Sequence, residues 1–205
     1  MAHSGRQEIG DTFVVGSYKL GSFLSRGVSG FLSGTVGSAI GLTAATGMRN
    51  KRKMVERHMR RVRPQASSIE IRRLTQQVFD SYARYYLESF RLPTLSSEQV
   101  ASTMTCEGYY ENMLPALERG HGVILALPHL GGWEWAGRWA ADLGNKMTVV
   151  VEPIEPPELF EWFAELRRKF GMTVIPLGPD AGPAVLKSLR NNEVLCLLSD
   201  RDITG

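Results

Sequence analysis

The sequence predicts an α/β protein, in which a helical N-terminal region precedes alternating strands and helices that form a largely parallel, helix-covered sheet. After Gly120, short apolar runs alternate with helix-like segments. The apolar runs are continuous, as is typical of parallel strands buried on both faces. The 205 residues, 43% of them hydrophobic and 22% charged, suffice for one such domain with a helical extension.

The N-terminal region from Val14 to Thr46 is glycine-rich, with apolar residues at roughly helical spacing. Residues 27–48 carry no charge over a length that could cross a bilayer, but 12 of these 22 residues are Gly, Ser or Thr. We therefore expect helices that lie at a membrane interface or pack as a close pair, which Gly30-x-x-x-Gly34 and Gly37-x-x-x-Gly41 would permit. A glycine-rich helix packed on the domain is the alternative.

The basic residues concentrate between Met48 and Arg63, where eight Lys or Arg accompany one acid, so the rest of the chain is net acidic. Such a run favours an anionic membrane surface, to which each cation contributes about 1 kcal/mol. A solvated helix face is the alternative. Nucleic acid is not expected, because the run has no interleaved aromatic residues. We predict a membrane-associating segment over residues 1–65 and an α/β domain over residues 66–205.

The boundaries of the remaining elements follow from local signals. Ser67-x-x-Glu70 is a capping box that predicts a helix to about Arg91, with Pro93 closing it. Shorter helices are expected from Ser97 to about Thr105 and from Tyr109 to Glu118. The expected strands are Val123–Leu127, Met147–Val151, Thr173–Pro176 and Val194–Ser199. The helices between them are Trp133–Leu143, Pro157–Phe170 and Gly182–Arg190.

His129 and Glu134 lie where the first strand gives way to a helix. Gly131 and Gly132 permit a tight turn and a close approach of substrate to the backbone. Glu134 falls in the first helical turn, where its carboxylate could reach the imidazole and make the other ring nitrogen a better proton acceptor. The free amides of the helix start could stabilise an oxyanion. We predict His129 as a general base; a purely structural histidine is the alternative.

Polar residues also follow two other strands. Because strand carboxyl ends line the ligand crevice of such sheets, Asp200 or Asp202 could orient a sugar hydroxyl and Arg201 could hold a phosphate or carboxylate. A surface ion pair is the alternative for this cluster. Glu152 could line the same crevice, although a solvated carboxylate is favoured. Three tryptophans at helical spacing could border an acyl channel, with core packing favoured: Trp133, Trp135 and Trp139.

Several classes of chemistry lack their signatures. The chain has no Gly-x-Ser-x-Gly elbow, no HExxH, no P-loop and no dinucleotide fingerprint. Cys106 and Cys196 lie far apart without Cys or His neighbours, so the cysteines give no zinc signature. Neither a metal nor a cofactor is expected. Residues 1–12 show no secretory signal. A histidine base without its own nucleophile suits direct attack by a substrate hydroxyl on an activated acyl group.

Three segments occur in an order that resembles a known family. They are Pro128-His129-Leu-Gly-Gly-Trp-Glu134, Leu159–Pro176, and Leu-Leu-Ser-Asp200-Arg201-Asp202. Together they resemble the lysophospholipid acyltransferase superfamily and, within it, the lipid A lauroyl/myristoyl acyltransferase branch. Ser81–Arg91, with Arg61-Val-Arg-Pro64 before it, is most similar to actinobacterial members that acylate the mannose of phosphatidylinositol mannosides.

The resemblance implies a glycerol-3-phosphate acyltransferase-like fold at the cytoplasmic face of the inner membrane, bound peripherally. It implies acyl transfer from acyl-CoA or acyl carrier protein, as co-substrate, to a sugar hydroxyl of a membrane glycolipid, without a covalent intermediate. His129 would be the base, Glu134 its orienting partner, and Asp200 and Asp202 would lie near a substrate.

Two departures from the family pattern leave alternatives open. Val151-Glu152-Pro153 replaces an aromatic-Arg-Pro triplet of many lipid A branch members, so an anion-binding arginine is missing and a mannoside acceptor is favoured. A Kdo-lipid acceptor is the alternative. The sequence stops soon after Asp202, where members of the family continue. We therefore expect a C-terminal truncation, and a non-catalytic membrane-binding fragment is a further alternative.

Overall fold

A computed structural model describes residues 15–25, 27 and 33–200. The chain divides into two compact units, residues 19–91 and the rest. The long helix α4 (Ser68–Arg91) therefore groups with the N-terminal helices. The division of function at residues 65 and 66 stays a prediction.

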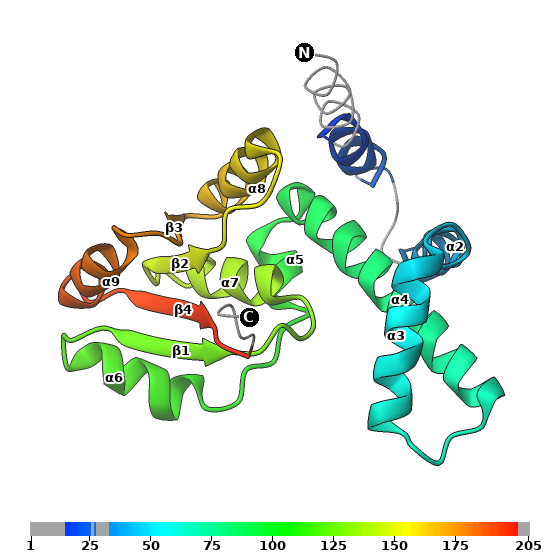
Figure 1. Ribbon diagram of the computed structural model, residues 1–205. Coiled ribbons are helices and arrows are strands. Elements are labelled where there is room, and N and C mark those ends of the chain that lie inside the picture. Colours follow the sequence, from blue (N-terminus) through cyan, green and yellow to red (C-terminus); the bar gives the residue numbers. More distant parts are fainter. Residues whose placement is uncertain (1–14, 26, 28–32, 201–205) are drawn as a thin grey trace. The chain divides into compact units, whose positions relative to one another are not determined.

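The helical unit contains α2 (Ser33–Gly47), α3 (Arg49–Val62) and α4 (Figure 1). Helix α2 packs on α4 through small residues: a Cβ added at Gly41 would lie 2.8 Å from Asp80 Cα, and one at Gly37 would lie 3.5 Å from Arg84 Cα. The close approach predicted from Gly37-x-x-x-Gly41 is therefore confirmed. Gly30 lies outside the described residues, and a Cβ at Gly34 would meet nothing within 4 Å.

The basic helix α3 has no buried residue and packs against α4 and α2. At the start of α4, the Ser67 hydroxyl accepts a hydrogen bond from the Glu70 amide at 3.2 Å, as the predicted N-cap requires. None of the described helices is both long and apolar enough to cross a membrane.

The α/β unit begins with short helices: η2 (Leu92–Thr94), α5 (Ser97–Ala101), η3 (Tyr109–Met113) and α6 (Leu114–Glu118). Helix α5 ends before the predicted Thr105 because nearby hydroxyls bind its last carbonyls. Ser102 donates to the Gln99 carbonyl at 2.9 Å and Thr103 to the Val100 carbonyl at 2.8 Å. Such local bonds compete with continuation of a helix.

Within the described residues, four parallel strands form one sheet in the order β1-β4-β2-β3. The strands are β1 (Val123–Leu127), β2 (Met147–Val151), β3 (Met172–Pro176) and β4 (Val194–Leu198); α7 (Trp133–Asp142), α8 (Pro157–Lys169) and α9 (Ala181–Arg190) connect them. These bounds match the expected ones to within one residue. The predicted fold class, α/β with a parallel sheet behind a helical N-terminal region, is confirmed.

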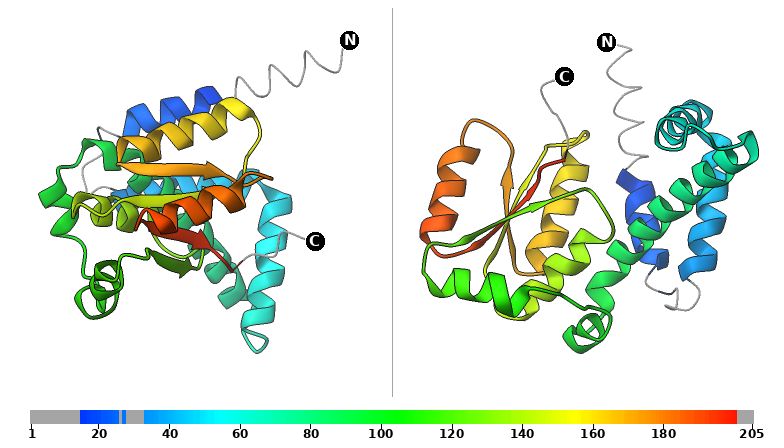
Figure 2. Two further views of the ribbon diagram at one scale, coloured as in Figure 1. Left: turned by 90° about the vertical axis from the view of Figure 1, so that its left-hand side faces the viewer. Right: turned by 90° about the horizontal axis from the view of Figure 1, so that it is seen from below.

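The order of the strands decides which helix covers which face. The chain runs from β1 to β2 to β3 in one direction across the sheet and then returns to β4. Right-handed crossovers place α7 and α8 on one face and α9 on the other, as Figure 2 shows. The returning strand β4 enters between β1 and β2, where Val194 and Leu195 are completely buried.

Candidate active site

The strand register brings His129 and Asp200 together. Leu127 of β1 pairs with Leu198 of β4, and the Ser199 amide continues the ladder by donating to the Leu127 carbonyl at 2.9 Å. His129 and Asp200 each lie two residues beyond the paired leucines. Parallel strands end at the same edge, so both side chains emerge at the carboxyl edge of the sheet.

Asp200 binds His129 through both carboxylate oxygens. Its Oδ1 lies 2.7 Å from Nδ1 of the ring, and its Oδ2 accepts the His129 backbone N–H at 2.8 Å. These two hydrogen bonds, the side-chain bond first, lower the pKa of Asp200 below its usual value of 3.8. Because the carboxylate is ionised at neutral pH, it can only accept, so Nδ1–H is the donor and the neutral tautomer compatible with this bond has its lone pair on Nε2. This is the tautomer that a general base needs.

The ring is accessible to substrate. The side chains of His129 and Asp200 are 46% and 41% exposed. Gly131 has a φ of 63°, a left-handed conformation that glycine adopts without strain, and a Cβ there would meet open space. Gly132 is the N-cap of α7. The turn therefore leaves open space at Gly131, two residues after the imidazole, and α7 begins directly after it.

Glu134 lies in a different environment from His129. It is 1% exposed, and its Oε1 accepts a hydrogen bond from Arg167 of α8 at 3.1 Å. The Arg167 guanidinium, whose side chain is only 11% exposed, also lies over the Trp133 ring at 4.8 Å from its centroid. Direct pairing of Glu134 with His129 stays a prediction, and the hydrogen bonds described here favour Asp200 for that position.

The other predicted residues lie at or near this edge. Glu152 follows β2 and is exposed, so it stands at the same carboxyl edge of the sheet. Arg201 and Asp202 lie outside the described residues. No group of three or more His, Cys, Asp or Glu side chains within the described ranges could hold a metal ion.

A mainly apolar cavity of about 560 Å³ lies along β1. Leu127 and Trp133, which flank the His129 turn in sequence, both line it, as does Trp139. Trp135 instead donates its Nε1–H to the Thr103 hydroxyl at 3.0 Å. Cys196 also lines the cavity, and burial raises the pKa of its thiol to about 11. The cavity therefore offers room for an apolar ligand beside β1 and α7.

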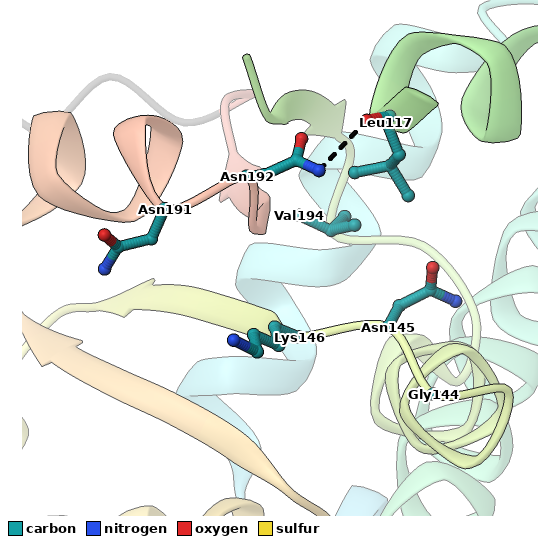
Figure 3. Close-up of a pocket in the computed structure, with 7 residues that line it drawn as sticks. All are labelled: Leu117, Gly144, Asn145, Lys146, Asn191, Asn192 and Val194. Atoms are coloured by element: carbon teal, nitrogen blue, oxygen red, sulfur yellow. Dashed lines mark hydrogen bonds between the residues drawn. The ribbon is translucent and has the colours of Figure 1, made fainter. Parts of the chain in front are cut away.

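A smaller, polar hollow of about 280 Å³ lies at the opposite, amino edge of the sheet (Figure 3). Two of the asparagines that line it, Asn192 and Asn145, make hydrogen bonds to other parts of the chain. Asn192 donates to the Leu117 carbonyl at 3.0 Å and accepts from the Gly122 amide at 2.9 Å, and Asn145 donates to the Tyr109 hydroxyl at 3.0 Å. The Asn192 bonds tie the loop before β4 to the segment before β1, and the Asn145 bond ties the loop before β2 to η3. We assign this hollow no role in chemistry.

The chain is similar to known acyltransferases. A family model described as "Bacterial lipid A biosynthesis acyltransferase" matches residues 18–205. Two strains of Mycobacterium tuberculosis have a phosphatidylinositol mannoside acyltransferase that is 37% identical over 129 residues, 61% of this chain. The Mycolicibacterium smegmatis protein of that name is 35% identical over 127 residues, 60% of this chain. Each match spans 41% of the length of the relative.

Proposed function

Because the chain belongs to the bacterial lipid A biosynthesis acyltransferase family, we propose that it transfers a fatty acyl chain to a hydroxyl group of a membrane glycolipid. The three similar proteins are named for phosphatidylinositol mannoside, so we propose a mannoside hydroxyl as the acceptor. Glu152 stands where many relatives with a lipid A acceptor have arginine, which supports the same choice. The single observation that carries the proposal is the His129–Asp200 pair at the open carboxyl edge of the sheet.

In the proposed reaction, His129 Nε2 removes the proton of the acceptor hydroxyl as its oxygen attacks the carbonyl carbon of an acyl thioester. The negative charge that forms on the carbonyl oxygen faces the amides at the start of α7. The tetrahedral intermediate then collapses, the carbon–sulfur bond breaks, and the imidazolium returns its proton to the thiolate. Asp200 keeps the ring in the reactive tautomer and stabilises the imidazolium. No covalent bond to the protein is required.

We propose acyl-CoA or acyl carrier protein as the donor, with its acyl chain in the cavity along β1. No other cofactor is needed for this chemistry. A Cβ added at Gly137, which lines the cavity, would lie 2.6 Å from Met172 Cε, so a larger side chain there would reduce the space. Gly137→Leu should shift the preference towards shorter acyl chains. An unchanged chain-length profile would remove the cavity from this role.

The test of the base uses acyl-CoA with phosphatidylinositol mannoside, and mass spectrometry of the lipid product. His129→Ala should lower the rate of transfer by about 10²–10⁴, the range that a general base supplies. His121→Ala is the matched control, because His121 is exposed, lies before β1 and should leave the rate unchanged. Retention of the rate in His129→Ala would refute the assignment. Transfer to a Kdo-lipid acceptor alone would support the alternative acceptor.

We propose that the protein works as a peripheral protein on the cytoplasmic face of the inner membrane. The basic residues of α3, none of them buried, support binding to anionic lipid headgroups. The competing function is a non-catalytic membrane-binding module. That module would bind anionic vesicles and show no acyl transfer, whereas the proposed enzyme does both.

A further inference from the structure

The apolar cavity along β1 is exposed on one side and closed on the other. Ile124 of β1, which lines it, is 54% exposed, and Cys106, which lines it as well, is also exposed. Towards β3, in contrast, the lining residues Met147 and Met172 are only 2% and 3% exposed. These exposures indicate that the cavity opens beside β1 and ends inside the protein at Met172.

The strand register gives the direction and the approximate length of the cavity. At the carboxyl ends of the strands, Leu127 of β1 is the strand residue that lines it. At the amino ends the lining residues are Val123, Met147 and Met172, which lie in one register row across the sheet. The cavity therefore runs diagonally across the sheet from Leu127 to Met172. Four steps along a strand at about 3.3 Å each and three strand spacings of about 4.8 Å make this diagonal about 20 Å, which suits an extended hydrocarbon chain.

Met172 meets helix α7 at a glycine. A Cβ added at Gly137 would lie 2.6 Å from Met172 Cε and 3.4 Å from its Sδ, so the tip of the methionine occupies the space that a side chain at Gly137 would fill. Both residues line the cavity. Methionine is unbranched and flexible and fills irregular gaps in cores, so its thioether is suited to close the end of a slot. The end wall of the cavity thus depends on one side chain that reaches α7.

We propose that Met172 is the end stop of the acyl site and determines the length of the acyl chain that the protein prefers. The inference rests on the proposed function, in which the acyl chain of the donor occupies this cavity. A chain whose last carbon meets the Met172 thioether fills the slot. A longer chain has to displace the methionine or leave carbons outside. Each missing methylene leaves apolar surface uncovered and costs about fourfold in affinity.

Competition among saturated acyl-CoA donors from lauroyl to arachidoyl tests the inference, with phosphatidylinositol mannoside as the acceptor and mass spectrometry of the products. Met172→Ala removes the side chain beyond Cβ, so the preferred donor should become about two carbons longer, with a change of about tenfold in the rate ratio of the two donors. Ile175→Ala is the matched control, because Ile175 is buried at 8% on the same strand and does not line the cavity. It should lower the stability and leave the preferred donor unchanged.

An exchange of size between two positions separates an end stop from a general effect on packing. The leucine side chain of Gly137→Leu should fit the space that Met172→Ala vacates. The double variant should therefore return to the chain length of the wild type. Identical donor profiles of Met172→Ala and wild type would overturn the inference, and so would an equal shift in Ile175→Ala. Circular dichroism verifies folding, and the milder Met172→Leu, which should shift the preference by a smaller amount, replaces an unfolded Met172→Ala.

Binding of free fatty acids distinguishes this inference from the proposed function. Trp133 and Trp139 line the cavity, so their fluorescence should report the binding of fatty acids without any transfer. Absence of transfer in the wild type would refute the proposed function. In that case a longer preferred fatty acid in Met172→Ala than in the wild type would still support the end stop, and equal preferences would overturn it.

Discussion

Removal of the Arg167 guanidinium tests how the start of α7 is held. Arg167→Met keeps a long apolar side chain at the site and deletes the cation that binds Glu134. Both partners are largely removed from water, with side-chain exposures of 11% for Arg167 and 2% for Glu134, so solvent screens the pair weakly. The stacking of Arg167 on Trp133 disappears with the same change.

The expected cost is large for a single substitution. Breaking a buried ion pair from one side destabilises a protein by about 3–5 kcal/mol, because a buried charge loses its counterion. A protein of this size shifts its melting temperature by about 2–4 °C per kcal/mol, so Arg167→Met should lower it by about 10 °C. Arg167→Lys keeps the positive charge but loses the planar guanidinium that stacks on Trp133 and offers several N–H donors. It should therefore destabilise the protein less than Arg167→Met.

Thermal and urea unfolding of four proteins completes the test: wild type, Arg167→Met, Glu134→Gln and the double variant. The double variant removes both charges, so it should be more stable than the sum of the single losses predicts. Additive losses would refute the coupling between Arg167 and Glu134. Acyl transfer should fall together with stability in Arg167→Met, because the displaced helix start carries the Gly131–Gly132 turn.

Three further outcomes are expected. Carbon NMR should show that the Asp200 carboxylate titrates below pH 3.8, so the stabilisation from its hydrogen bonds is present above that pH and is lost as the pH falls through the lowered pKa. His129→Ala should raise the titration midpoint of Asp200. An unchanged midpoint would contradict the hydrogen bond to His129 as the cause of the lowered pKa. Gly41→Ala should destabilise the α2–α4 contact, because its Cβ would meet backbone atoms of α4. Gly34→Ala is the control and should be neutral or stabilising. Equal melting temperatures of the two variants would count against the packing of α2 on α4. Alkylation at pH 8 should be slow at Cys196, whose pKa is raised to about 11, and rapid labelling of its peptide would contradict the raised pKa.

Local signals predicted the elements of the α/β unit well. Continuous apolar runs between glycines and prolines identify buried strands, and the structure places β1, β2 and the start of β4 at the predicted residues. The end of α5 was missed because the hydroxyls of Ser102 and Thr103 bind backbone carbonyls, a choice that depends on side-chain rotamers rather than on composition.

The partner of His129 could not be derived from spacing alone. Glu134 is close in sequence, whereas Asp200 is 71 residues away and reaches the ring because β4 enters the sheet beside β1. The order of strands is a property of the whole fold. The sequence predicted that His129 and Asp200 each follow the end of a strand. It did not predict that these two strands, β1 and β4, lie side by side.

Arg167 was overlooked as one of several basic residues near the end of a helix. A signal was nevertheless present. Arg167 lies four residues after Phe163 and three before Phe170, and both aromatic side chains are buried. An arginine on the apolar face of a helix indicates an inward cation with a carboxylate partner.

The position of β4 couples assembly of the sheet to the chemistry. Among the described strands, β1 has β4 as its sole neighbour, so a chain in which β4 has not yet docked leaves β1 unpaired. In that state His129 has no Asp200 to hold its ring, and an acyl thioester would meet an unactivated imidazole. Docking of β4 beside β1 therefore brings Asp200 to the imidazole, so pairing of these two strands also assembles the base.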